Sequence, residues 1–172
     1  VAGLVVLAAV GAFPTLALVA HFEDPGDHQG PAFTLDGQRY AEANYAEEMA
    51  AIDWLDRRDG RPTILTRPGS APYQWRSAPS AFSGLPTVAG WIHEAGYHGR
   101  AAYERRVRDV RRIYTADAST ARRLLAEYGV EYLYVGPVER AAYDLRNPGR
   151  IPGVRVAYGN DRVTIYAVNG TG

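Results

Sequence analysis

The sequence predicts an α/β domain with a mostly parallel sheet flanked by helices, an antiparallel C-terminal hairpin, and one transmembrane helix in front of it. Residues 1–20 contain no charged side chain, and about 20 apolar residues span the hydrocarbon of a bilayer as a helix. Helical and strand-like periods then alternate along the chain, which is typical of a parallel sheet covered by helices. Finally, two apolar runs flank a short polar turn near the carboxyl end, the pattern of a hairpin.

Composition limits the classes of function. The 172 residues are 47% hydrophobic and 22% charged, which fits a single membrane-tethered domain. The net charge is zero, so no overall field recruits nucleic acid, and we expect no nucleic-acid partner. The chain contains no Cys, which excludes disulfide scaffolds, thiol catalysis and thiolate metal sites. It also lacks Lys, so every cation other than His is an Arg.

We expect two parts. Residues 1–22 are predicted to be the last transmembrane helix of a truncated multi-pass protein, because the chain has no initiator Met, no basic leader and no small-residue cleavage pattern. A buried soluble helix is the alternative for this segment. Residues 23–172 are predicted to be an α/β domain, which begins with a Gly-, Pro- and Asp-rich exit loop.

Regular elements follow in order. An apolar stripe predicts a helix over residues 42–58, and the apolar run at residues 63–66 predicts a buried strand. Residues 67–99 are broken by four prolines but rich in aromatic side chains. This predicts an ordered irregular loop over the end of the sheet, because disordered segments contain few aromatics.

The second half has clearer signals. Residues 101–114 have an apolar stripe on an Arg-rich background, which predicts an amphipathic helix. Asp117 is a plausible N-cap for a following helix, and Gly129 suits its end. Residues 130–135 are predicted to form a strand, and the hairpin is predicted to join residues 154–158 to residues 163–168.

The central loop contains the candidate site. His93, Glu94 and His98 could supply three ligands to a divalent ion, which is the one cofactor that the sequence suggests. Their spacing is not that of the zinc proteases, because Tyr97 stands where the second His would be. Structural hydrogen bonding by these side chains is the alternative. Glu94, His93 and Asp109 are also eligible by type for acid–base work.

Aromatic and cationic side chains suggest a different ligand. Trp91, Tyr97 and Trp75 would suit stacking on the face of a sugar, and packing of the loop on the domain is the alternative. Arg105 and its neighbours on the helix could clamp a phosphate or pyrophosphate, with Asp109 orienting the guanidinium groups. A solvated helix face is the corresponding alternative. No catalytic residue is identified.

Several phrases together indicate a family. The motifs are Leu35-Asp36-Gly37, Ala51-Ile52-Asp53-Trp54-Leu55, Gly84-Leu85-Pro86-Thr87-Val88, Gly90-Trp91 with His93-Glu94, Arg105/Arg106, Asp109-Val110, Ile113-Tyr114, and Tyr132-Leu133-Tyr134-Val135-Gly136 with Glu139-Arg140 and Tyr143. From about residue 33 to the end, the chain resembles the extracytoplasmic C-terminal domain of the YYY membrane proteins, an archaeal and Chloroflexi multi-pass family with a domain of unknown function. That family usually has Trp-Arg-Gly where this chain has Tyr97, His98 and Gly99.

The resemblance implies a role. The YYY proteins resemble membrane glycosyltransferases that use polyprenyl-phosphate sugars, so the chain is expected to contribute to donor or acceptor binding. The resemblance also implies that the protein lies in the cell membrane, with residues 23–172 as an extracytoplasmic domain. The implied ligand contacts are Trp91, His93, Glu94, Tyr97, His98 and Arg105, with Asp109 in support. The implied partners are the membrane, a lipid-linked sugar and the rest of the multi-pass protein, which would contain the catalytic carboxylate. The alternatives are a non-catalytic glycan- or partner-binding module and a metal-dependent hydrolase.

Overall fold

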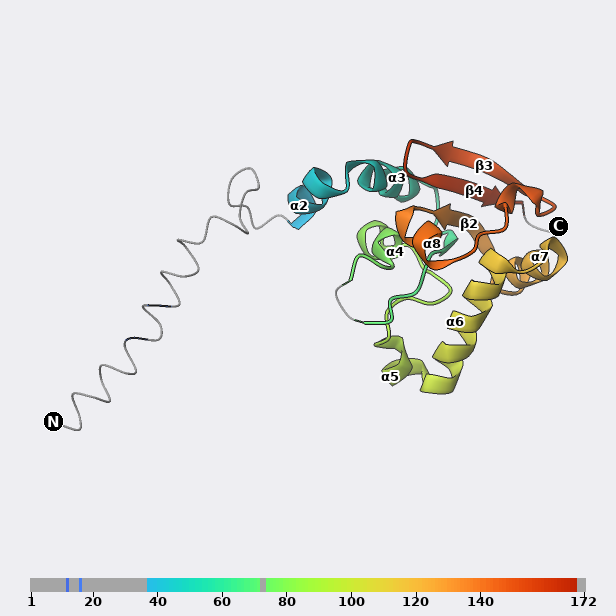
Figure 1. Ribbon diagram of the computed structural model, residues 1–172, viewed down its shortest axis with the longest axis horizontal. Helices are drawn as coiled ribbons and strands as arrows, with labels where there is room; N and C mark the ends of the chain where they lie inside the picture. The colour runs from blue at the N-terminus through green and yellow to red at the C-terminus, as the bar shows by residue number, and fades with distance from the viewer. Residues whose placement is uncertain (1–11, 13–15, 17–36, 72–73, 170–172) are drawn as a thin grey trace. The chain divides into compact units, whose positions relative to one another are not determined.

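The computed structural model describes residues 12, 16, 37–71 and 74–169 (Figure 1). The chain divides into two units, residues 1–44 and 45–172, and each is described by itself. In the first unit, helix α2 (Gly37–Asn44) is described, and its Asn44 Nδ2 donates to Tyr40 O at 2.8 Å. The membrane span predicted over residues 1–22 lies outside the described residues, apart from Ala12 and Leu16. Within the residues described, every helix is too short or too polar to cross a membrane.

The second unit is built on one mixed sheet of four strands: β1 (Thr63–Leu65), β2 (Val130–Val135), β3 (Val154–Gly159) and β4 (Thr164–Val168). Their order is β1-β2-β4-β3. Only β1 and β2 are parallel, whereas β4 pairs antiparallel with both β2 and β3. The prediction of a mostly parallel sheet was therefore wrong. β3 and β4 are joined by a short turn, which can join only antiparallel strands, and β4 also lies between β3 and β2, so it adds a second antiparallel pair.

Helices pack on both faces of this sheet (Figure 1). Helices α6 (Arg100–Thr115) and α7 (Ala118–Glu127) share one core with Leu65 and Leu133. Helix α3 (Ala46–Asp56) shares a second core with Ile64 and Tyr134. Successive residues of β1 and β2 thus enter opposite cores, as the alternation of side chains along a strand requires.

Several predicted elements are confirmed. Helix α6 begins one residue before its prediction and ends one after it. Asp117 caps α7, because its carboxylate accepts the Ser119 and Thr120 N–H groups, each at 3.0 Å. The strand β2 and the terminal hairpin are also confirmed. The helix predicted over residues 42–58 starts only at Ala46, and α2 was not predicted.

Short helices were missed. The centre at residues 67–99 was predicted to be irregular, but it contains α4 (Ala78–Ser83) and α5 (Glu94–His98). Helix α8 (Pro137–Ala142) and the 3₁₀ turn η1 (Pro148–Arg150) follow β2. Each spans fewer than two turns, which is too little sequence for an apolar stripe to repeat.

The central segment also lies along the outer edge of β1. Ile64 N donates to Pro86 O at 2.8 Å, Gly69 N to Gly90 O at 3.0 Å, and Ile92 N to Gly69 O at 2.9 Å. Parallel bridges pair Ile64 with Thr87 and Gly69 with Trp91. The backbone of residues 86–92 therefore covers the edge that β1 would otherwise expose, and it leads directly into α5.

Candidate functional site

The α5 corner, defined as residues 90–105, contains all but one of the predicted ligand contacts. It consists of the end of the edge segment, α5 and the first turns of α6. Gly99, with a φ of +84°, separates the two helices, a conformation that favours glycine. Because α5 and α6 are separated by this one residue, the side chains of the short helix are held close to the Arg-rich one.

The side chain of Trp91 packs against neighbouring backbone. Its ring is partly buried, and its Nε1 donates to Arg76 O at 2.7 Å. The ring also lies against the backbone of Gly69, where an added Cβ would be 2.3 Å from Trp91 Cδ1. An indole with its N–H bonded and its edge against backbone has a packing role, so the alternative of loop packing describes this side chain.

Glu94 and Tyr103 fix the same backbone. Glu94 Oε1 accepts the Gly90 N–H at 2.8 Å. The Tyr103 hydroxyl, which is buried on α6, lies 3.1 Å from Gly69 O and 3.4 Å from Gly90 O. Burial, and secondly the Glu94 carboxylate, raises the pKa of Tyr103, so the hydroxyl keeps its proton and remains a donor. Glu94 thus has the structural hydrogen-bonding role that was the alternative to a ligand contact.

The remaining predicted residues face solvent. Tyr97 is 85% exposed, and His93, His98 and Arg105 are exposed as well. Arg100 forms an ion pair with Glu104 at 3.9 Å, but both side chains are more than half exposed, so this pair contributes little stability. The corner therefore exposes a phenol, two imidazoles and guanidinium groups to solvent. Its backbone is held by the hydrogen bonds of Trp91, Glu94 and Tyr103.

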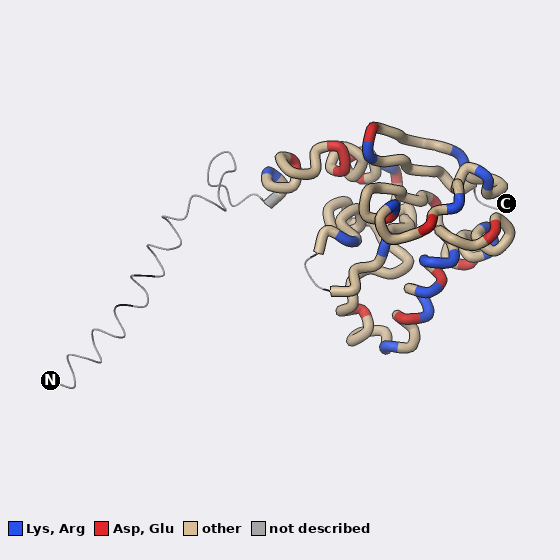
Figure 2. The backbone as a smooth tube through the Cα atoms, in the orientation of Figure 1, with Lys and Arg blue, Asp and Glu red and all other residues tan. Residues whose placement is uncertain are grey.

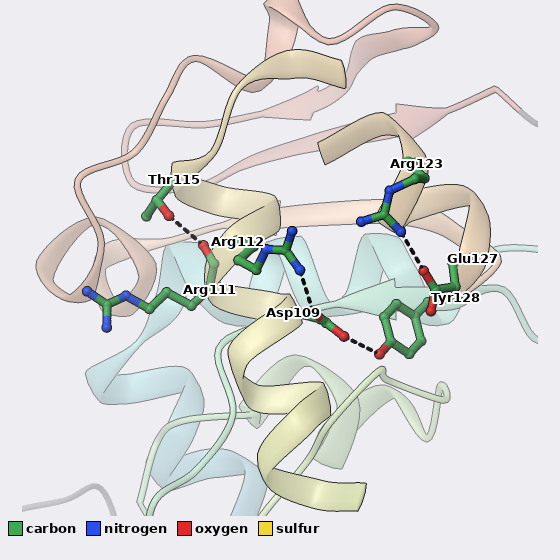
Figure 3. A network of polar contacts seen from close by, with 7 residues as sticks. All are labelled: Asp109, Arg111, Arg112, Thr115, Arg123, Glu127 and Tyr128. Carbon is green, nitrogen blue, oxygen red and sulfur yellow. Dashed lines mark hydrogen bonds and ion pairs between the residues drawn. The ribbon is translucent and has the colours of Figure 1, made fainter. Parts of the chain in front are cut away.

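Asp109 lies deeper and connects α6 to α7 (Figure 3). Its Oδ1 pairs with Arg112 Nη1 at 3.3 Å, and its Oδ2 accepts the Tyr128 hydroxyl at 2.8 Å. Among the described residues, Arg105 forms no ion pair with Asp109. Arg105 lies close enough to Tyr128 to lower its pKa, although burial and Asp109 raise that pKa more. Asp109 thus orients Arg112, whereas in the part of the chain that the structure describes Arg105 has no hydrogen bond or ion pair to this network.

The three side chains of the metal hypothesis do not converge in the structure. Across residues 37–71 and 74–169, no three His, Asp or Glu side chains gather where they could hold a metal ion. Glu94 turns back toward the Gly90 N–H, whereas His93 and His98 are exposed. Trp75 is also absent from the predicted aromatic group, because it stacks on Tyr45 with ring centroids 3.8 Å apart.

Two buried carboxylates were not singled out as functional by sequence reasoning. Glu139 is 2% exposed and joins the carboxyl ends of β1 and β2, with Oε1 accepting Arg67 N at 2.9 Å and Oε2 accepting Gly136 N at 3.0 Å. Glu48 accepts Trp75 Nε1 at 3.0 Å. Burial raises the pKa of both groups. The signal for Glu139 was available, because Pro at the first helical position with Glu at the third marks a helix start.

Basic side chains concentrate on α6. Figure 2 shows Arg along much of this helix, with few acidic residues between them. This agrees with the solvated helix face that the sequence left open, and it places guanidinium groups at both ends of the helix. The far end, at the joint with α7, borders a pocket of about 270 Å³.

Comparisons with known proteins find similarity among solved structures. No family model matches the sequence, and no curated protein matches it. Among solved structures, the chain is similar to the C-terminal globular domain of an oligosaccharyltransferase from Archaeoglobus fulgidus. The sequence identity is 9% and the TM-score 0.47, and the match covers 70% of this chain and 95% of that one.

Proposed function

We propose that the chain is the C-terminal part of a membrane glycosyltransferase that uses a polyprenyl-phosphate sugar, and that its α5 corner contacts the donor or the acceptor. The motifs shared with the YYY membrane proteins support the enzyme class. The role is one of binding, because in the described residues the carboxylates of the corner, Glu94 and Glu104, are occupied by the Gly90 N–H and by Arg100. The catalytic carboxylate is expected elsewhere in the full protein.

The observation that carries this proposal is that Tyr97 is exposed on a helix whose neighbouring backbone is held by hydrogen bonds. A large aromatic side chain that is 85% exposed loses apolar contact with protein, yet it stands on a helix whose base is fixed by Trp91, Glu94 and Tyr103. A ring held this way can stack on a sugar face without first ordering its own backbone.

Charge fits the same ligand. Arg100 and Arg105 lie within a few residues of Tyr97, and guanidinium groups bind phosphate oxygens through paired hydrogen bonds. His98 is exposed at the end of α5 and could add a hydrogen bond from either ring nitrogen. A phosphate-linked sugar offers a face for the tyrosine and an anion for these groups.

The test is an NMR titration of the full 172-residue chain, in micelles, with a citronellyl-phosphate hexose as a short-chain substrate analogue. We expect shifts at Tyr97, His98 and Arg105, loss of binding in Tyr97→Ala, and retained binding in Tyr97→Phe, which keeps the ring. Val156→Ala, at an exposed apolar residue on β3, is the matched control and should bind as the wild type does.

Unchanged affinity in Tyr97→Ala would contradict the proposal. The methyl glycoside of the same hexose separates the alternative of a simple glycan-binding module. That alternative predicts equal affinity for the methyl glycoside and the phosphate-linked sugar. The proposed role instead predicts weaker binding without the phosphate.

A further inference from the structure

A pocket of about 270 Å³ lies at the joint between α6 and α7, outside the α5 corner. Its lining residues are Ile113, Ala116, Asp117, Ala118, Arg146, Asn147, Arg150 and Ile151. Ile113 is eight residues beyond Arg105, the last residue of the corner, so it lies about 12 Å further along the helix.

Hydrogen bonds connect the backbone segments around the pocket. Arg146 N donates to Tyr114 O at 3.0 Å, which fastens the segment after α8 to the end of α6. Asn147 Oδ1 accepts Gly149 N at 2.9 Å and caps η1, and Ile151 N donates to Pro148 O at 3.0 Å. These hydrogen bonds hold the backbone around the pocket, and a backbone that is held in place lowers the entropic cost of binding a ligand.

Arg146 and Arg150 place two guanidinium groups at this pocket. Within the described residues, neither Arg146 nor Arg150 makes a side-chain hydrogen bond or an ion pair. Both side chains are exposed, so they can turn toward a ligand without breaking a contact. The side-chain amide of Asn147 adds a donor at the same rim.

Asp117 is the one acidic residue of the lining, and its carboxylate is already satisfied. Its two oxygens accept the N–H and hydroxyl groups of both Ser119 and Thr120. These hydrogen bonds lower the pKa of Asp117, and the positive end of the α7 dipole offsets its charge further. The pocket therefore has a net positive rim over a floor formed by Ile113 and Ile151, both of which are buried.

We propose that this pocket binds a phosphoryl group carried on a small, partly apolar molecule. The guanidinium pair matches phosphate oxygens, and the isoleucine floor accepts the body of the ligand. This site is independent of the ligand proposed for the α5 corner, so either can fail without the other.

The experiment is an NMR titration of the full chain with phenyl phosphate, inorganic phosphate and neutral benzyl alcohol. We expect phenyl phosphate to shift the methyl signals of Ile113 and Ile151, and to bind more tightly than either of the other two. Arg146→Gln and Arg150→Gln should each weaken its binding about tenfold, the effect of losing a charged hydrogen bond. Arg155→Gln, at an exposed arginine on β3, is the matched control and should leave the affinity unchanged.

Three results would overturn the proposal. They are the absence of methyl shifts with phenyl phosphate, equal weakening by the Arg155 variant, and benzyl alcohol binding as tightly as phenyl phosphate. Dihexanoyl phosphatidic acid, added below its micellar concentration, identifies the source of the phosphoryl group. Tighter binding than phenyl phosphate assigns the site to a lipid headgroup, and weaker binding assigns it to a soluble phosphate ester.

Discussion

Replacing Gly69 by alanine tests whether the packing of Trp91 fixes the base of the α5 corner. A Cβ at Gly69 would lie 2.3 Å from Trp91 Cδ1 and 3.0 Å from Nε1. The indole cannot stay in place at such distances, and the ring is rigid, so the whole side chain must move. That movement breaks the 2.7 Å hydrogen bond from Trp91 Nε1 to Arg76 O.

The magnitude follows from these two effects. Inserting a methyl group into a packed site costs about 1–3 kcal/mol, and losing the hydrogen bond costs about 0.5–1.5 kcal/mol. We therefore expect Gly69→Ala to lower the free energy of unfolding by about 1.5–4.5 kcal/mol. The assay is urea unfolding followed by far-UV circular dichroism, with the denaturant slope compared between variants to confirm that the unfolding transition is the same.

Gly96→Ala is the matched control. Gly96 lies within α5, and a Cβ there would meet nothing within 4 Å. Alanine is the better helix former by up to about 1 kcal/mol, so this variant should be at least as stable as the wild type. The packing argument is refuted if Gly69→Ala unfolds at the same urea concentration as Gly96→Ala.

Two further predictions concern the interior. Tyr114→Phe should lower the free energy of unfolding by about 0.5–1.5 kcal/mol in the same assay, because it removes the 2.7 Å hydrogen bond from the buried Tyr114 hydroxyl to Tyr134 O. Equal stability would contradict this role. The second is a pH dependence: burial raises the pKa of Glu139 and Glu48 above the ordinary value of 4.5. The folded state then binds more protons than the unfolded state above that pH, so stability should fall as pH rises from 4.5 through the raised values. Urea midpoints measured across this window should fall less steeply in Glu139→Gln, and an unchanged slope would argue against the assignment.

The sequence could predict elements whose signals are local. The stripe of α6, the Asp117 cap and the apolar run of β2 each depend on residues within a few positions of one another. The order of the sheet was not accessible in this way. Whether β3 or β4 lies next to β2 depends on contacts between residues far apart in the chain, and both strands have the same local pattern.

In the candidate site, too, residue types could be read from the sequence, whereas contacts between distant residues could not. The residue types of the α5 corner led to the prediction of ligand contacts in this segment. His98 and Tyr97 are exposed there. Trp91 is not available in the same way, because its partner is the carbonyl of Arg76, fifteen residues earlier. No local sequence pattern predicts a contact between residues that far apart. Arg146 and Arg150 were overlooked for the opposite reason, since they become neighbours of Asp117 only when the chain folds.

Glu94 has a structural partner close to it in the sequence. Its carboxylate reaches back four residues to the Gly90 N–H at 2.8 Å, and a Cβ at Gly90 would lie only 2.5 Å from Glu94 Oε1. A side chain at position 90 would crowd the carboxylate, which would have to shift at the end of the flexible Glu94 side chain. Gly90 and Glu94 thus act together, because the absence of a side chain at position 90 leaves space for the Glu94 carboxylate. Adjacent His93 and Glu94 looked like two ligands for one ion, but the carboxylate is committed to the backbone and only the imidazole faces outward.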